Sequence, residues 1–419
     1  MEKFKKLIFG GLVLASISLQ AQNFSLESCK SKARANFPLI KQLGILENLK
    51  GLSLENLSKG YLPQLNFNAQ GTYQSEVTSL PISLPNMTIK SLDKDQYKTY
   101  LEVYQPLLDG QQVKKQQAVS KSSYAVETQK VEVELYKINA TVNQLYFGIL
   151  LLDSQLKSTN SLLGEVDANL NKLTIGVKEG IVNPLNKEVF DAEKIKIVQR
   201  IEELGFARKS LISSLGVLIN EAISENVSFE MPKQISTLPE NKRPELALFD
   251  LQIGNLEQQK ALIQNKLNPR LGLMGQIGYG RPALNMLNND FKEYYIGGLK
   301  LSWSISSFYT NSRERKILES QKGIIAAQRE VFQQQTNLNN VQVQREIEKW
   351  DALLRTDGQL VETRKRIVAA AEVQFGQGTL SSLDYLAYIN QLEQANQQIQ
   401  LHQLQKLQST YQQQYLFGN

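Results

Sequence analysis

Few side chains in this sequence have the types and spacing that chemistry requires. Its 419 residues include one histidine, His402, and one cysteine, Cys29. His402 lies in a glutamine-rich terminal segment with no partner motif, so it completes neither a Ser/His/Asp set nor a typical zinc site. No phosphate-binding loop or dinucleotide fingerprint is present. We therefore expect no catalytic residue, no metal site and no cofactor, and we predict that the protein is not an enzyme.

Two remaining polar features have ordinary interpretations. Cys29 suggests a lipidated N-terminus, but the residues before it do not resemble a lipoprotein signal, so we favour a small buried residue on the first helix. Asp357 and Arg364 lie seven residues apart on an otherwise apolar helical register. They could pair across helices, but a solvated or tunnel-facing position is the favoured interpretation.

The first residues form a targeting segment. Lys3, Lys5 and Lys6 precede an apolar run over 7–19, which is shorter than the ~20 residues of a membrane-spanning helix. We predict a signal peptide over 1–21, cleaved after about Ala21, and therefore export. The formal net charge of +6 includes this basic segment, and no basic block follows it. Nucleic-acid binding is not expected.

A very long helix organises the rest of the chain. Apolar residues recur at steps of three and four from Leu135 to Leu156 and again from Leu163 to Val177, with polar Thr159 between the two runs. A heptad seam of this length predicts a coiled coil. We place the helix at 111–175, where about 1.5 Å per residue makes a rod of roughly 100 Å.

Strict alternation of side chains predicts strands next to this rod. From Leu65 to Tyr73, apolar and small residues alternate with Asn, Gln and Thr, as in a strand with one apolar and one polar face. A second strand is predicted over 97–107, where Pro106 and the Asp109–Gly110 turn end it. Each strand has about 10 residues, the length that crosses a bilayer at a tilt.

The plan then repeats. A shift of 206 places YLPQLNFNAQGTY on LNPRLGLMGQIGY, and a shift of 198 places Gly180 on Gly378. We predict a first repeat over 22–225, a linker over 226–240 and a second repeat over 241–419. The first repeat contains a helix, a strand pair (61–108), the long helix (111–175) and a return helix (185–219). The second contains a helix, a strand pair (267–307), a long helix (312–374) and a return helix (383–416).

Strands and rods in one exported chain indicate a membrane channel. A soluble sheet with one face on a core is the alternative, but such a sheet does not explain rods of this length. Four strands cannot close a barrel, and open strand edges are not tolerated in lipid. The fold class we predict is an α+β membrane protein: a long helical coiled-coil barrel joined to a β-barrel shared among identical chains in a ring.

Several motifs carry a family resemblance that covers essentially all of the mature chain. The doubled plan, the LP-x-L strand openings, the QPLLDG segment and the turns GVKEGIVNPLN and FGQGTLSSLDYL resemble the TolC family of outer-membrane efflux proteins. The resemblance implies a homotrimer in which each chain contributes four strands to one barrel. It also implies an outer-membrane location, a helical tunnel in the periplasm, and two partners: a periplasmic adaptor protein and an inner-membrane transporter.

The resemblance places a gate at the two helical turns. In the family's best-known member, the tip carries a tyrosine, an arginine and two aspartates that help hold it closed. The matching positions here are Phe375, Leu380, Asp384 and Ala387, and the repeat mate of Asp384 is Asn186, so a bonded polar latch is in doubt. A ring of three Asp384 side chains could still select cations; simple capping by Ser381-x-x-Asp384 is the alternative. Gly180 and Gly378 suit the tight turns.

Aromatic residues in the strands suggest a membrane-interface belt. The candidates are Tyr73, Tyr97, Tyr279, Tyr295 and Trp303. Ordinary packing within the sheet is the alternative. We therefore predict the exit duct of a tripartite efflux or type I secretion system, in contact with outer-membrane lipid. The alternative function is a soluble periplasmic coiled-coil adaptor or scaffold.

Overall fold

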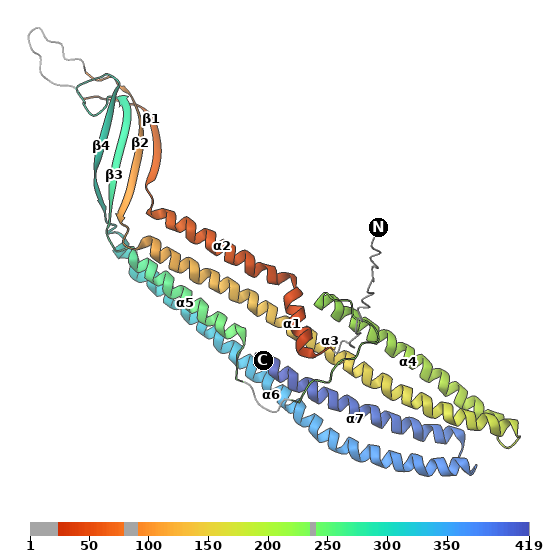
Figure 1. The fold of residues 1–419 in the computed structure, drawn as a ribbon. Helices are drawn as coiled ribbons and strands as arrows, with labels where there is room; N and C mark the ends of the chain where they lie inside the picture. The colour runs from red at the N-terminus through yellow and green to blue at the C-terminus, as the bar shows by residue number, and fades with distance from the viewer. Residues whose placement is uncertain (1–23, 79–90, 235–239, 419) are drawn as a thin grey trace, which may run out of the picture.

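The fold is a sheet at one end of a long helical rod (Figure 1). The computed structural model describes residues 24–78, 91–234 and 240–418, so the predicted signal peptide lies outside the described residues. The helices are α1 (Leu26–Asn36), α2 (Lys41–Ser58), α3 (Gln112–Lys178), α4 (Pro184–Ile219), α5 (Pro244–Asn265), α6 (Ser307–Gly376) and α7 (Ser382–Leu416). The strands are β1 (Gln64–Tyr73), β2 (Asp95–Leu108), β3 (Arg270–Arg281) and β4 (Lys292–Ser302). None of the described helices is both long and apolar enough to cross a membrane.

Helix α3 is the spine of the molecule. It contacts α2 and α5 in the half next to the sheet and α4 and α7 in the other half (Figure 1). Its predicted seam is an interior surface: Leu135, Val142 and Ile149 are buried. The polar residue within the seam, Thr159, is also buried. Its hydroxyl is satisfied there, because it donates to the carbonyl of Gln155 at 2.8 Å.

The middle of the rod is fixed by an aromatic and aliphatic cluster around Tyr146. This side chain is fully buried, and its hydroxyl lies 2.6 Å from the carbonyl oxygen of Phe24 and 2.7 Å from that of Glu230. Cys29 is buried in the same cluster on α1, which confirms the favoured interpretation. Burial raises the pKa of its thiol to about 11, so it is a poor nucleophile.

The four strands form one antiparallel sheet in the order β1-β2-β3-β4. Residues directly opposite each other share a face, so the register shows which side chains stand together. The middle row of one face runs from Phe67 to Leu101, Ile277 and Tyr295. The register shifts only between Pro106 and Leu108, where proline cannot donate to the ladder, and β2 continues past this proline to Leu108.

Two expectations about buried polar groups were wrong. His402 has a partner: its Nδ1 lies 2.6 Å from Oδ2 of Asp357, and both side chains are buried. Asp357 is therefore not solvated but bonded across helices, which was the alternative, and the guanidinium of Arg364 likewise donates to Gln391 of α7 at 2.5 Å. The α6–α7 hairpin brings Asp357 and His402 together, although they are 45 residues apart in the sequence.

Replacing Asp357 with alanine is expected to destabilise this hairpin. His402 would lose its buried acceptor, and an unsatisfied buried donor costs about 1–3 kcal/mol. The matched control is Asp351→Ala, because Asp351 pairs with Lys406 across the same two helices but in a more exposed place, where such pairs contribute less than about 1 kcal/mol. Urea unfolding measures the free energy of unfolding of both variants. Equal losses of this free energy would show that the buried pair stabilises the hairpin no more than the exposed pair does.

Candidate functional site

The end of the rod far from the sheet is closed by two similar turns. Gly180 follows α3 and Gly378 follows α6, and both have φ near +73°, which glycine adopts without strain. Asn183 begins α4 by accepting a hydrogen bond from the backbone N–H of Leu185 at 2.9 Å, and proline follows it. The two helical hairpins therefore end side by side (Figure 1).

An aromatic cluster joins the two hairpins beneath these turns. Phe190 of α4 and Tyr385 of α7 are almost fully buried, and Phe375 of α6 contacts both of them. The ring centroids of Phe375 and Tyr385 are 4.6 Å apart, and those of Phe190 and Phe375 are 6.0 Å apart. Leu380 packs against the same cluster. Phe375 and Leu380 were predicted tip residues, whereas Phe190 and Tyr385 were missed.

Asp384 lies beside this cluster at the start of α7, with its side chain exposed. Ser381 Oγ accepts from the backbone N–H of Asp384 at 3.1 Å and donates to its carboxylate at 2.6 Å. The residue thus takes part in the capping that the sequence pattern suggested. Asn186, its predicted repeat mate, is half-buried, and its backbone N–H donates to the carbonyl of Asn183 at 2.9 Å.

Three acidic residues lie close to the tip cluster: Glu165 and Glu393 are half-buried, and Glu372 is exposed. Burial raises the pKa of Glu165 on α3, and the nearby carboxylates of Glu372 and Glu393 raise it further. Burial also raises the pKa of Tyr385 to about 12, so its hydroxyl stays protonated at physiological pH. The carboxylate of Glu372 lies 3.9 Å from the ammonium group of Lys172, which offsets part of the negative charge of the three acidic residues. No group of three potential metal ligands is found within the described ranges.

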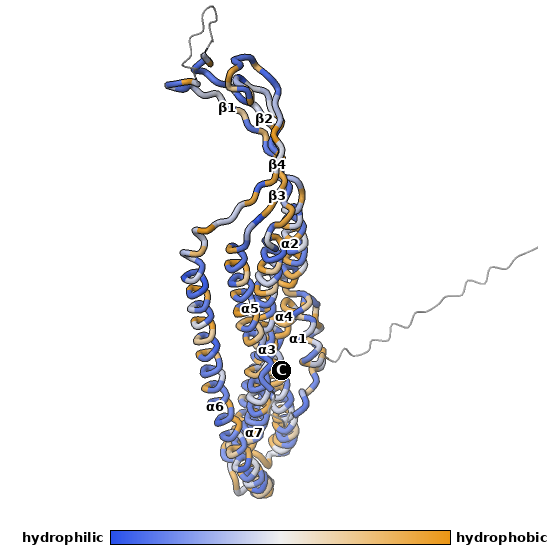
Figure 2. The backbone as a smooth tube through the Cα atoms, turned by 90° about the vertical axis from the view of Figure 1, so that its left-hand side faces the viewer, coloured by the Kyte–Doolittle hydropathy of each residue, from blue (hydrophilic) through white to orange (hydrophobic). Residues whose placement is uncertain are grey.

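The sheet presents a second candidate surface, its apolar face. Hydrophobic and hydrophilic residues are interspersed along the strands (Figure 2), and the exposed apolar side chains of this face belong to all four strands. They are Leu65, Phe67, Tyr73, Tyr97, Leu101, Leu273, Ile277, Tyr279, Tyr295, Leu299 and Leu301, all of them exposed. A contiguous apolar surface of this extent indicates contact with lipid or with another chain.

The predicted belt residues occupy different heights on this face. Tyr97 and Tyr279 stack on Phe291 near the far rim, with centroids 6.4 Å and 5.6 Å from it. Tyr73 ends β1 at the same rim, whereas Tyr295 stands in the middle row. Trp303 lies at the foot of the sheet, where its indole N–H donates to the carbonyl of Leu267 at 2.9 Å.

Two further aromatic side chains belong to these groups but escaped the sequence analysis. Phe291 joins the rim stack, and Phe308 packs edge-on against Trp303 with centroids 6.2 Å apart. Both lie just outside the strands, so strand alternation could not identify them. The available signal was their position next to predicted strand ends.

Solved structures with a similar fold include outer-membrane channels. Residues 238–418 match the family described as outer membrane efflux protein. No curated protein matches the sequence. The described fold is similar to that of VceC from Vibrio cholerae, an outer membrane protein, with a TM-score of 0.66 at 13% identity over 94% of this chain and 96% of that one.

Two other solved structures are comparable. The CmeC outer membrane channel of Campylobacter jejuni has a TM-score of 0.64 at 13% identity, over 94% of this chain and 85% of that one. The MtrE outer membrane channel of Neisseria gonorrhoeae, solved in an open state, has a TM-score of 0.65 at 15% identity, over 94% of this chain and 89% of that one. The resemblance to the TolC family of outer-membrane efflux proteins is confirmed. The family and the fold together support an exit channel for efflux.

Proposed function

We propose that this chain forms the outer-membrane exit duct of a tripartite efflux or type I secretion system. The observation that carries the proposal is the two-faced sheet. Its strands have 10, 14, 12 and 11 residues, which is enough to cross a bilayer at a tilt. One face is apolar below its rim and the other is polar, as a barrel wall requires between lipid and a water-filled lumen.

A single chain cannot complete such a barrel. Strands β1 and β4 are the two edges of the sheet, and an unpaired edge is very costly in lipid. Joining β4 of one copy to β1 of the next removes every edge when the ring closes. We propose a trimer with 12 strands, which agrees with the resemblance drawn from the sequence.

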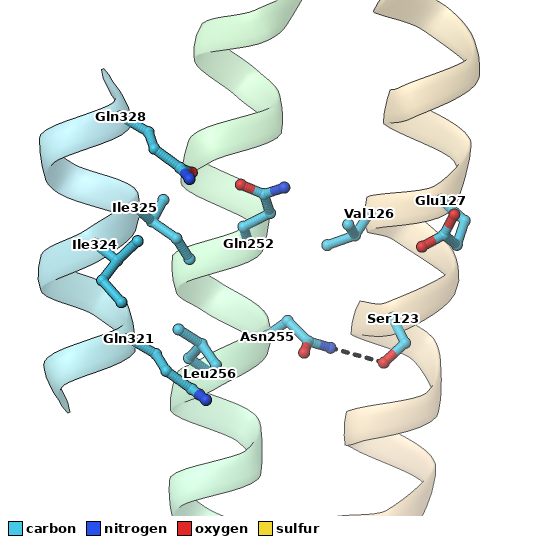
Figure 3. Close-up of a pocket in the computed structure, with 10 residues that line it drawn as sticks. All are labelled: Ser123, Val126, Glu127, Gln252, Asn255, Leu256, Gln321, Ile324, Ile325 and Gln328. Carbon is cyan, nitrogen blue, oxygen red and sulfur yellow. Dashed lines mark hydrogen bonds between the residues drawn. The ribbon is translucent and has the colours of Figure 1, made fainter. Parts of the chain in front are cut away.

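Helix α6 also has an apolar surface that no other described part of the same chain covers. Exposed apolar residues recur every seven positions on α6, as on a coiled-coil helix that lacks its partner. They are Ile317, Ile324, Val331 and Leu338. Ile324 borders an open groove of about 400 Å³ between α6, α5 and α3, whose other side includes Val126 (Figure 3).

The opposite flank offers a complementary surface. Helix α2 lies across the rod from α6 (Figure 1) and exposes Ile45, Leu49 and Leu52 at helical spacing. In a closed ring, α2 of one copy would meet α6 of its neighbour. We propose that these two surfaces form the trimer interface, that the helical part lies in the periplasm, and that its tip meets the adaptor protein and the inner-membrane transporter.

The purified protein is expected to run as a detergent-stable trimer and to form discrete pores in a planar lipid bilayer. Both measurements are made on the mature chain. A monomer that stays in buffer without detergent and makes no pores would contradict the proposal and favour a periplasmic scaffold. A stable trimer whose pores open rarely would agree with a closed tip.

Asp384→Ala tests the proposed ring at the tip. Three carboxylates at a constriction attract cations, so the variant is expected to lose potassium preference relative to wild type. Reversal potentials in a salt gradient measure this difference. Asp191→Ala is the matched control, because Asp191 lies near the tip in the N-terminal part of α4 but pairs with Lys187. If Asp384→Ala keeps the potassium preference of wild type, Asp384 caps α7 but does not select ions.

A further inference from the structure

The polar face of the sheet carries an excess of positive charge. Its charged residues are Lys98, Glu102, Arg270, Lys292 and Lys300, as the strand register and side-chain alternation show. Four are basic and one is acidic, a net charge of +3 in each chain. On the apolar face, charged residues of the strands occur only at the far rim: Asp95, Arg281 and Glu293.

These lysines are not neutralised by neighbours. Among the described residues, no carboxylate lies within 4.0 Å of the ammonium groups of Lys98, Lys292 or Lys300. At the far rim, by contrast, the basic residue Arg281 is neutralised: it pairs with Asp95 at 2.5 Å and with Asp93 at 3.3 Å. Arg270 also has no carboxylate within 4.0 Å in the described part of the chain, and it donates to the side-chain oxygen of Gln112 at 3.2 Å. The polar face therefore carries an excess of unpaired cations, although Glu102 and Asp109 border the same groove as Arg270 and Lys300.

The register gathers two of the lysines into one row. Lys98 and Lys292 both stand opposite Gly280, on either side of β3. Two strand spacings separate them, about 10 Å, which is close to the Debye length of about 8 Å at physiological salt. A Cβ at Gly280 would lie 2.6 Å from the backbone carbonyl oxygen of Tyr97 and 3.0 Å from the Cγ of Lys98. The glycine thus leaves room for the lysine over the strand.

Tyrosine rings fill the space between the charges. The ring of Tyr104 lies across Gly272, and the ring of Tyr294 lies across Gly278, each about where a Cβ would stand. Tyr100 shares the row of Tyr294. The polar face is therefore basic and aromatic. A surface of this kind attracts anions and offers ring faces to molecules with aromatic groups.

We infer that the sheet end of the duct is an anion-selective filter, suited to cargo with negative charge and aromatic groups. This inference rests on the proposed function, because only a closed barrel turns the polar face into a lumen. Three copies would bring a net charge of +9 to its wall. The proposed Asp384 ring at the other end has the opposite sign, so the two ends would filter charge differently.

The test is the triple variant Lys98→Gln/Lys292→Gln/Lys300→Gln. Both it and its parent carry Asp384→Ala, which removes the tip carboxylate from the comparison. In a potassium chloride gradient across a planar bilayer, the parent is expected to prefer chloride, and the triple variant is expected to lose that preference. The control Lys50→Gln/Lys130→Gln/Lys137→Gln removes the same charge from helix surfaces and is expected to keep the parent's ratio.

Pyrophosphate supplies a second measurement with the same proteins. Added from the barrel side, it is expected to reduce conductance through the parent and the control but not through the triple variant. Parent pores that prefer potassium, or a triple variant with an unchanged permeability ratio, would overturn the anion filter while leaving the channel intact. Absence of pores from every protein would instead remove the channel, and the filter with it.

Discussion

Replacing Ile277 with arginine is expected to abolish stable insertion into lipid. Ile277 is 70% exposed and stands in the middle row of the apolar face, beside Leu101 and Tyr295. An arginine on the lipid face of a barrel costs about 2–4 kcal/mol at the membrane midplane. A trimer contains three copies, so the total is about 6–12 kcal/mol if the sites act independently. That loss is comparable to the whole stability of many domains.

The adjacent residue supplies the control. Gln276 lies on the polar face, in the row of Glu102, so Gln276→Arg would place the same charge in the lumen. We expect this variant to insert like wild type. The stability of both variants in lipid vesicles is measured by urea titration, in which the fluorescence of the two tryptophans reports unfolding. Equal stability of the two variants would mean that neither face contacts lipid, as a soluble scaffold requires.

Periodicity carried most of the information about the fold. The alternation from Leu65 to Tyr73 predicted which side chains share a face, and Leu65, Phe67 and Tyr73 are exposed on the apolar one. The heptad spacing around Val142 predicted an interior seam, and that residue is fully buried. Local rules suffice here because helices and strands impose their repeats on neighbouring residues. The trimer, the closed barrel and the gate remain predictions, since they concern contacts between copies.

The sequence analysis failed mainly to predict contacts between residues that are distant in the sequence. His402 was treated as isolated, yet Asp357 lies opposite it across the turn at Gly378. The signal was available, because two residues at mirror positions about a tight turn face each other in an antiparallel hairpin. Asp153 and Arg208 occupy such positions about Gly180 and form an ion pair. Phe190 was missed for a related reason, since its partners are on a different hairpin.

Phe190→Ala is expected to open the tip. The ring is fully buried between the two hairpins, and truncation of a buried phenylalanine costs about 3–5 kcal/mol. The tip cluster is separate from the cluster around Tyr146 in the middle of the rod. The loss is therefore expected to appear as local unfolding rather than as collapse of the whole chain. Residues 180–190 and 378–389 should exchange amide hydrogens much faster, and pores should conduct more current or open more often.

Phe206→Ala is the matched control, because Phe206 lies on the same helix and is 69% exposed. It is expected to leave hydrogen exchange at the tip and pore conductance unchanged. Hydrogen exchange measured by mass spectrometry on the trimer separates a local effect from a global one, and single-channel recording shows its consequence. If Phe190→Ala loosens the tip but the conductance stays that of wild type, the aromatic cluster holds the hairpins together without closing the duct. If exchange at the tip does not change, the cluster does not hold them either.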